Sequence, residues 1–242
     1  GFGLVRTPSN FGSLGERPTH PRLLDWLTLQ FVKSGWSLKQ LHRQVLLSAT
    51  YQRSSDYREE NYKVDGDNRL LWRMNRRRLE VEPWRDAMLA VSGNLDDTFG
   101  GPSRNLADAK NRRRTLYGFV SRHKLDELLR LFDFPDPNIT SARRTSTTVP
   151  LQQLFVLNSE FMTGQAKALV QRLEKDVPED QTGRIKRAYL LLFGRPPSEI
   201  ELIVGKEFLK TAASDDEKDS KLAPWEQYTL VLLGSNEFIY LD

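Results

Sequence analysis

The sequence predicts a mainly α-helical fold, a single helical domain built of helical hairpins with at most one short β element. Three observations predict it: apolar residues recur at a 3.6-residue period, capping residues precede many of these stretches, and proline or glycine stands at their ends. The chain has 242 residues, enough to bury a substantial core. Its hydrophobic content of 38% is typical of a globular protein.

The first third of the chain predicts an antiparallel pair of helices. Residues 6–18 carry turn-forming residues without a period, which indicates a loop. Thr19 is the expected N-cap of a first helix that stops at Gly35, and Ser37 is the expected N-cap of a second that runs to about Arg53. Two helices with so short a connection are expected to pack side by side.

The later elements follow from the same pattern of period, cap and stop. Residues 54–67 and 211–221 are expected to be loops, and Thr115–Val120 is the one β-prone segment. Ser198 and Glu201 have the spacing of a capping box, and Thr148 with Pro150 the pattern of an N-cap and first helical residue. Further helices are expected over residues 68–79, 80–92, 122–132, from 150 onward, 159–174, 184–193, 198–210 and 224–233.

We expect one domain over residues 1–242. Residues 178–242 could form a semi-detached helical subdomain, because Asp176–Asp180 has the composition of a linker. The chain opens on an apolar, glycine-containing segment, Gly1–Val5, without an initiator methionine. We therefore expect it to be a fragment of a longer protein.

Composition argues against several classes of function. The chain has no cysteine, which excludes disulfides, thiolate metal sites, a cysteine nucleophile and covalently attached c-type haem within it. Its three histidines are scattered, so we expect no metal site and no cofactor in this chain. A net charge of +4 is too diffuse for a dedicated nucleic-acid binder. No apolar run approaches about 18 residues, so we expect no membrane insertion by this chain.

The most distinctive segment is Leu125–Pro150, where a helical pattern stops at two prolines and a long polar stretch follows. Compact domains rarely keep such a stretch unless it binds or locks something. Arg143 and Arg144 could present planar donors to a carboxylate, sulfate or phosphate. Asp133 and Asp136 are the alternative partners, which would make the arginines a structural lock. We expect one arginine to lock the loop and the other to face a ligand, with Arg143 favoured over Arg144 as the buried one.

Three further residues are candidates for ligand contact. Glu82 and Asp86 lie one helical turn apart, opposite an apolar stripe, where an ion-paired or solvated face is the ordinary outcome. Phe134 lies between turn residues and could either fill a core or offer a platform for a sugar ring. The chain has neither the Gly-x-Ser-x-Gly elbow of a hydrolase nor a phosphate-binding loop. The sequence therefore names no catalytic residue.

Eight short segments together carry a resemblance to a known family. They are Thr19–Trp26, Gly35–Lys39, Ser48–Tyr51, Asn68–Leu79, Arg85–Leu89, Phe132–Pro137, Leu192–Pro196 and Asn236–Phe238. With them the chain resembles the planctomycete PSD-type domain, a C-terminal domain of unknown function in large planctomycete surface proteins that also contain a cytochrome-c-like domain. The resemblance covers nearly the whole chain.

The resemblance implies an exported parent protein, periplasmic or on the cell surface, that works on complex extracellular material. Its partners would be the other domains of the parent, a polysaccharide or an envelope protein, and any haem would lie in another domain. It implies no catalytic residues.

Three functions are compatible with these expectations. The first is a non-catalytic scaffold or binding domain that recognises a glycan or a partner protein. The second is a hydrolase acting on extracellular, sulfated polysaccharide, which predicts a pocket that gathers two carboxylates or an arginine cluster from distant segments. The third is docking for cytochrome-type electron transfer, which predicts a patch of one charge sign around Trp or Tyr.

Overall fold

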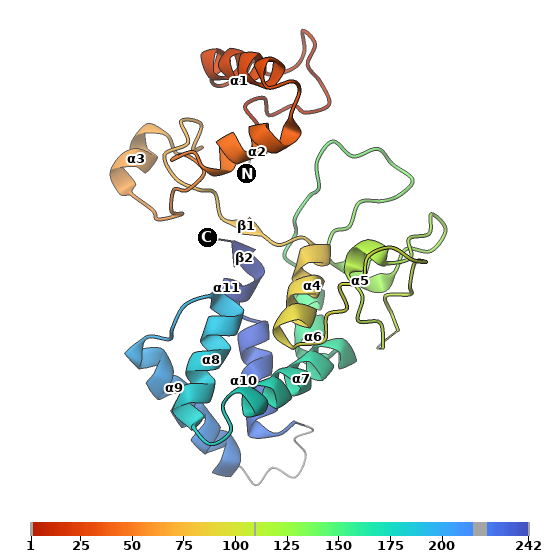
Figure 1. The fold of residues 1–242 in the computed structure, drawn as a ribbon, viewed down its shortest axis with the longest axis vertical. Coiled ribbons are helices and arrows are strands. Elements are labelled where there is room, and N and C mark those ends of the chain that lie inside the picture. The colour runs from red at the N-terminus through yellow and green to blue at the C-terminus, as the bar shows by residue number, and fades with distance from the viewer. Residues whose placement is uncertain (1, 109, 215–221, 242) are drawn as a thin grey trace. The chain divides into compact units, whose positions relative to one another are not determined.

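The computed structural model describes residues 2–108, 110–214 and 222–241, and these residues form a mainly α-helical fold (Figure 1). Within them lie eleven α-helices, one short 3-10 helix and a two-stranded sheet, which confirms the predicted fold class. The chain divides into two compact units: unit 1 comprises residues 1–77 with 241–242, and unit 2 comprises residues 78–240. This division falls between Arg77 and Arg78, about a hundred residues before the linker-like segment.

Unit 1 contains the predicted helical hairpin. It is formed by α1 (Pro21–Lys33) and α2 (Leu38–Leu46), with Gly35 in the left-handed region at φ 69° between them. The Ser37 side chain accepts a hydrogen bond from the Gln40 backbone, as expected of an N-cap, whereas α1 is preceded by His20 and not by Thr19. The segment predicted to be a loop over residues 54–67 contains a short helix, α3 (Glu59–Val64).

The helix predicted over residues 68–79 is wrong. The Asp65 carboxylate accepts hydrogen bonds from the backbone N–H groups of Arg69 (2.8 Å) and Leu70 (2.6 Å), and the Asn68 side chain donates to the Arg73 carbonyl (2.7 Å). Side-chain bonds of this kind compete with the helical ladder for the same backbone groups. Asn68 and Leu71 accordingly have positive φ angles, of 52° and 59°. The segment ends in a short strand, β1 (Arg77–Arg78), which pairs with β2 (Tyr240–Leu241).

Unit 2 holds the main hydrophobic core. Helix α10 packs against α7, α8 and α9, and α7 also packs against α4 and α6 (Figure 1). Side chains from several of these helices are almost completely excluded from solvent, among them Met88, Met162, Leu169, Ile185 and Leu233. The helices of unit 2 are α4 (Val81–Val91), α5 (Glu127–Leu131), α6 (Pro150–Asn158), α7 (Glu160–Asp176), α8 (Gln181–Phe193), α9 (Glu199–Ser214), α10 (Pro224–Leu233) and α11 (Asn236–Ile239).

Most predicted helices of unit 2 are confirmed, with shifted ends. The helix expected from residue 198 continues to Ser214, so the predicted loop 211–221 begins later, and its residues 215–221 lie outside the described residues. The N-cap of α6 is Val149 and not Thr148. The sequence analysis missed α11. No helix among the described residues is both long and apolar enough to cross a membrane.

Two further predictions in unit 2 are corrected, one in the type of element and one in its extent. The segment predicted as a strand, Thr115–Val120, begins with a 3-10 helix over Thr115–Tyr117. The Asp86 carboxylate accepts hydrogen bonds from both the backbone N–H (2.6 Å) and the hydroxyl of Thr115 (2.7 Å), so that N–H cannot join a strand ladder. The helix predicted over 122–132 starts only at Glu127, because the Asp126 side chain caps it by accepting from the Leu128 N–H.

An ion-pair cluster joins two of the segments that carry the family resemblance. Arg195, just after α8, donates to Glu201 of α9 through two nitrogens (2.8 and 2.9 Å) and to Glu237 of α11 through two (2.6 and 2.7 Å). Glu201 also accepts from the Ser198 N–H, which confirms the predicted capping box. The hydrogen bonds from Arg195, opposed by burial, lower the pKa of Glu201 from 4.5 to about 2. The cluster therefore fastens the ends of three helices together.

We predict that this cluster makes stability depend on acidic pH. A carboxylate with a lowered folded-state pKa stabilises the fold fully above its unfolded value, and this contribution is lost as the pH falls from about 4.5 toward about 2. The melting temperature of the native protein should therefore fall more steeply below pH ~4.5 than that of Glu201→Gln. The exposed Glu199→Gln is the matched control and should follow the native curve. Parallel curves for the native protein and Glu201→Gln would contradict the assignment.

Candidate functional site

Arg144 is held by acidic residues from a distant helix. Its two terminal nitrogens donate to the two carboxylate oxygens of Glu82 at 2.7 and 2.8 Å, and one of them also lies 3.0 Å from a Glu80 oxygen. Its guanidinium carbon lies 5.1 Å from the centre of the Phe134 ring. Burial is the largest single effect and favours the neutral form of Glu82, but the hydrogen bond from Arg144, a backbone hydrogen bond and the charge of Arg144 together outweigh it and lower the pKa of Glu82. Arg144, Glu82 and Phe134, three of the candidates named from sequence, therefore lie together.

The aspartates of the loop have other partners than the arginines. Asp133 accepts hydrogen bonds from the backbone N–H (2.8 Å) and hydroxyl (2.6 Å) of Thr147, and Asp136 accepts from the N–H of Asn138 (2.9 Å). The expectation that these acids would pair with Arg144 is thus corrected: the pairing acids are Glu80 and Glu82. Arg143 is exposed, whereas Arg144 is half-buried, so the expectation that Arg143 would be the more buried of the two is wrong.

Arg78, which the sequence did not single out, anchors the same loop from its far end. It donates to the carbonyl of Thr147 and to the side chain of Gln152 (3.0 Å), and its guanidinium carbon lies 5.4 Å from the centre of the Phe132 ring. With Asp133 bound to Thr147 and Arg144 bound to Glu82, the loop between α5 and α6 is fastened at three places. The hydrogen bonds of the Arg144 guanidinium are made within the protein, which is the geometry of a structural lock.

We predict that Arg144→Met lowers the free energy of unfolding of unit 2 by about 1–2 kcal/mol. The value lies between those of exposed and buried ion pairs because the Arg144 side chain is 30% exposed and that of Glu82 is 23% exposed. Denaturant unfolding followed by circular dichroism measures the change. Arg122→Met, which removes an exposed arginine elsewhere in unit 2, is the control and should change stability by less than about 0.5 kcal/mol. Equal effects of the two substitutions on the free energy of unfolding would contradict a structural role for Arg144.

Asp86 lies in a second polar network beside Arg85. Arg85 is almost fully buried and donates to the carbonyls of Asn111 (2.6 Å) and Arg113 (3.0 Å) and to the Thr115 hydroxyl (3.2 Å). Burial lowers the pKa of Arg85, with opposing attraction from Asp86. Asp86 and Arg85 therefore fix the segment 111–115 on α4, and Asp86 does not join the Arg144 cluster.

A pocket of about 620 Å³ lies elsewhere in unit 2, and we call it the phenylalanine pocket. Three phenylalanines, Phe119, Phe155 and Phe161, line it together with backbone and side chains of three segments distant in sequence. Its polar and charged lining residues are Asn105, Ser121, Lys124, Asp126, Glu127, Ser159 and Glu160. The pocket thus combines three aromatic side chains with hydrogen-bonding groups.

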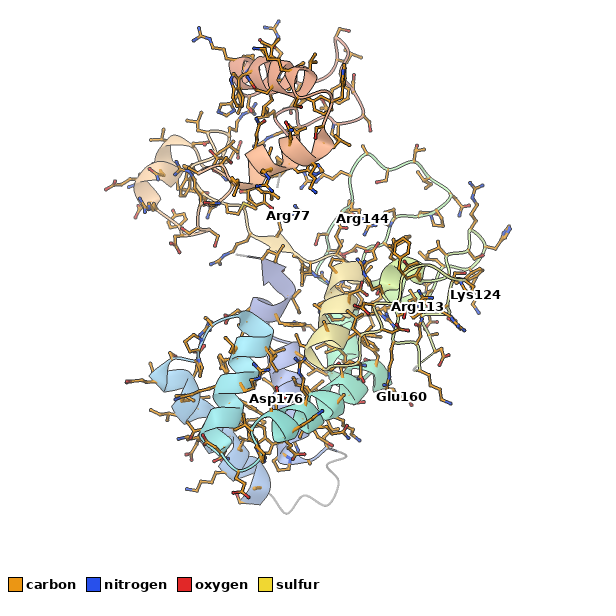
Figure 2. All side chains as sticks on the ribbon, viewed as in Figure 1. Arg77, Arg113, Lys124, Arg144, Glu160 and Asp176 are labelled. Atoms are coloured by element: carbon orange, nitrogen blue, oxygen red, sulfur yellow. The ribbon has the colours of Figure 1, made fainter. Side chains whose placement is uncertain are left out.

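The carboxylates of the phenylalanine pocket come from two helix starts. Asp126 caps α5 and Glu127 is its first residue. Glu160, labelled in Figure 2, is the first residue of α7. Lys124 supplies the one basic side chain among the lining residues. The sequence analysis did not name this site, because each residue has an ordinary role in its own segment: a cap, a first-turn acid or an aromatic in an apolar pattern. Only the tertiary fold places the starts of α5 and α7 around one pocket.

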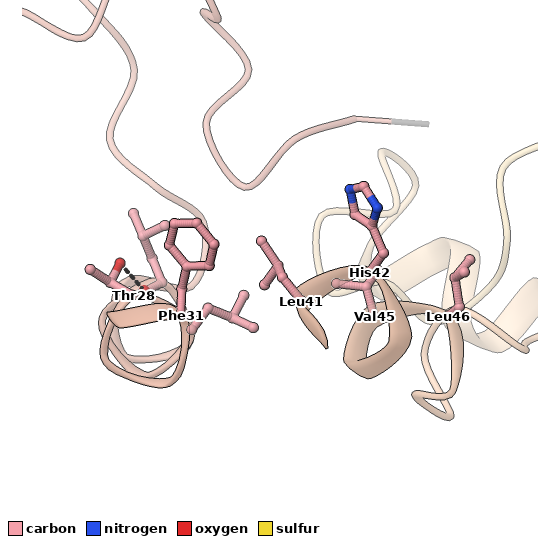
Figure 3. A pocket seen from close by; sticks show the side chains of 8 residues that line it. Thr28, Phe31, Leu41, His42, Val45 and Leu46 are labelled. Atoms are coloured by element: carbon pink, nitrogen blue, oxygen red, sulfur yellow. Dashed lines mark hydrogen bonds between the residues drawn. The ribbon is translucent and has the colours of Figure 1, made fainter. Parts of the chain in front are cut away.

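Two other cavities lie outside the phenylalanine pocket. One of about 590 Å³ in unit 2 is bordered by Arg78, Gln152 and side chains of α6 and α10. The other, also about 590 Å³, lies between α1 and α2 of unit 1, where Phe31, Leu41 and Val45 line it with His42 (Figure 3). Thr148, Gln153, Ser235 and Asn236 add polar groups to the first cavity, whereas Thr28 and His42 are the polar lining residues of the second. Among the described residues, no group of three or more His, Asp or Glu side chains is placed to hold a metal ion.

Comparison with known proteins identifies the family of the chain. The family model PSD1, described as a protein of unknown function (DUF1553), matches residues 1–209. No curated protein matches the chain, and no solved structure matches it either. The matched range includes the α1–α2 hairpin and the phenylalanine pocket. It also includes residues 132–149 between α5 and α6, which we call the Arg144 loop.

Proposed function

The chain belongs to the PSD1 family of proteins of unknown function, and from this premise we propose that unit 2 is a non-catalytic glycan-binding module. One observation carries the proposal: the phenylalanine pocket joins three aromatic side chains to carboxylate, amide and hydroxyl groups. The C–H faces of a sugar ring stack on aromatic rings, and its hydroxyls donate to carboxylates and amides. A pocket of this size is within the usual range for small ligands and short oligomers.

The setting of the module is part of the same proposal. An exported, envelope-associated parent, in which other domains of the protein are the immediate partners, is supported by the resemblance to planctomycete surface proteins. A haem group would belong to another domain of that parent. Within this setting the Arg144 loop has a structural role, and the ligand contacts are assigned to the phenylalanine pocket.

A hydrolase is the second candidate, and a specific feature favours it. Glu127 of α5 and Glu160 of α7 line one pocket although they lie far apart in sequence. A pair of carboxylates can serve as acid and base in glycoside hydrolysis. The lining carries three carboxylates and one lysine, a charge balance that disfavours a sulfated substrate. The sugar expected in this pocket is therefore neutral or cationic.

Binding to an array of neutral, amino, uronic and sulfated glycans tests the proposal. We expect neutral or amino glycans to be retained, and Phe119→Ala to weaken the best of them about tenfold or more, because a stacked aromatic face is lost. Leu116→Ala is the matched control, since Leu116 is exposed in the same segment but does not line the pocket. Retention of no glycan, or equal affinity of Phe119→Ala and the native protein, would refute the assignment.

Incubation of the best array glycan with the native protein separates binding from hydrolysis. We expect the glycan to be recovered intact, with no new reducing ends. Cleavage that disappears in both Glu127→Gln and Glu160→Gln, while binding persists, would instead establish the hydrolase and overturn the non-catalytic role.

A further inference from the structure

Phe99 is an apolar side chain that unit 2 displays almost completely to solvent, with 95% of its surface exposed. It stands on the turn Thr98–Gly101, in which Gly100 and Gly101 have positive φ angles of 77° and 92°. Exposed single apolar residues are common, so exposure by itself assigns no role. The distinguishing feature is the rigidity with which this turn is held.

The turn is fastened on both sides of Phe99. Arg113 donates to the carbonyl of Thr98 (2.7 Å) and to that of Gly100, while the Tyr117 hydroxyl accepts from the Gly100 N–H (2.9 Å). The Arg113 guanidinium carbon lies 4.4 Å from the centre of the Tyr117 ring. A bridge between Asp96 and Arg113 closes the base of the turn. Phe99 is therefore presented in one place, so that little conformational entropy is lost when it binds.

The chain segment that carries Phe99 is basic. Residues 96–124 contain seven arginines and lysines against three aspartates, a net charge of +4 that equals the charge of the whole chain. Most of these basic side chains are exposed, among them Arg104, Lys110, Arg112 and Arg114. A partner of this surface must combine an apolar recess for a phenyl ring with carboxylates around it.

We infer that the Phe99 turn docks on an acidic amphipathic helix of a partner protein. The apolar stripe of such a helix offers holes between four side chains that take a protruding ring, and carboxylates flank the stripe within reach of the arginines. A sugar ring would cover one face of Phe99 only, whereas a hole between helix side chains covers both faces. The net charge of the segment selects an acidic helix over a basic one.

Fluorescence anisotropy with three labelled synthetic peptides of about 20 residues tests this inference. One has a leucine stripe flanked by glutamates, the second has lysines in place of the glutamates, and the third has serines in place of the leucines. We expect the native chain to bind only the first peptide, and Phe99→Ser to bind it about 10- to 100-fold more weakly. Leu14→Ser, a change at an exposed leucine of unit 1, is the matched control and should bind like the native chain.

Two further measurements complete the test: the salt dependence of peptide binding, and binding of the sulfated polysaccharide heparin. Raising the salt from about 0.05 M to about 0.5 M should weaken the native complex, and replacing Arg112 and Arg114 with glutamine should reduce that dependence. The inference is overturned if the leucine–glutamate peptide does not bind, if Phe99→Ser leaves its affinity unchanged, or if the lysine peptide binds equally well. Heparin binding that is lost in Phe99→Ser would overturn it as well, because it would identify an anionic polysaccharide as the occupant.

Discussion

Trp84→Ala should lower the free energy of unfolding of unit 2 by about 3–5 kcal/mol. Trp84 is only 1% exposed, and its ring centre lies 4.4 Å from that of Phe132 and 6.4 Å from that of Phe155. Phe132 and Phe155 also contact each other, at 5.5 Å. Removal of the indole leaves a cavity that the rigid helices around it can fill only in part. Urea unfolding followed by circular dichroism measures the loss.

Trp84→Phe separates the packing of the ring from its polar group. The indole N–H of Trp84 has no hydrogen-bond partner among the described residues, so a phenyl ring forfeits no hydrogen bond there. We expect this substitution to cost about 1–2 kcal/mol. A loss as large as that of Trp84→Ala would show that the contact depends on the indole itself and not on aromatic packing.

Asp86→Ala should destabilise unit 2 by about 2–4 kcal/mol. The substitution leaves the buried backbone N–H of Thr115 without its acceptor and removes a carboxylate beside the buried guanidinium of Arg85. Each hydrogen bond to a charged group contributes about 1.5–3 kcal/mol, and an unsatisfied buried N–H adds a penalty. Thermal and denaturant unfolding measure the effect.

Two further substitutions serve as controls for Asp86→Ala. Asp86→Asn keeps an oxygen that can accept from Thr115, so it should cost clearly less than Asp86→Ala. Asp97→Ala removes an exposed aspartate of the same unit and should change the free energy of unfolding by less than about 0.5 kcal/mol. If Asp86→Ala were as mild as Asp97→Ala, segment 111–115 would be held by other contacts.

Local sequence rules predicted the elements whose ends are encoded within a few residues. The Ser37 cap and the Ser198–Glu201 capping box are of this kind, and so is Gly194, which ends α8 in the left-handed region at φ 69°. The family resemblance is confirmed over residues 1–209. Its segments include Arg195 and Glu237, which the fold joins in one ion-pair cluster.

Two of the predictions that failed concern backbone groups captured by side chains. Asp65 binds the N–H groups that a helix over 68–79 would need, and Asp86 binds the N–H that a strand at Thr115 would need. No periodicity reveals such capture, because a short carboxylate can serve as a surface charge or as a backbone acceptor with the same sequence pattern.

The candidate site could be located only in part from sequence. The loop after Pro135 was identified, but Arg144 pairs with Glu82, which lies 62 residues earlier in the chain. The phenylalanine pocket was not predicted, since its walls come from residues 105–107, 119–128 and 155–161. A site assembled by tertiary packing leaves no contiguous pattern for sequence rules to detect.

The central claim is that the phenylalanine pocket binds the glycan while the Arg144 loop is structural. One titration experiment tests it most directly: calorimetric binding of the best array glycan to Phe119→Ala and to Arg144→Met, each with its melting temperature. The account predicts that Phe119→Ala loses affinity about tenfold or more and melts like the native protein, while Arg144→Met melts lower and binds the glycan as the native protein does. The reverse outcome, with affinity lost in Arg144→Met and retained in Phe119→Ala, would contradict it.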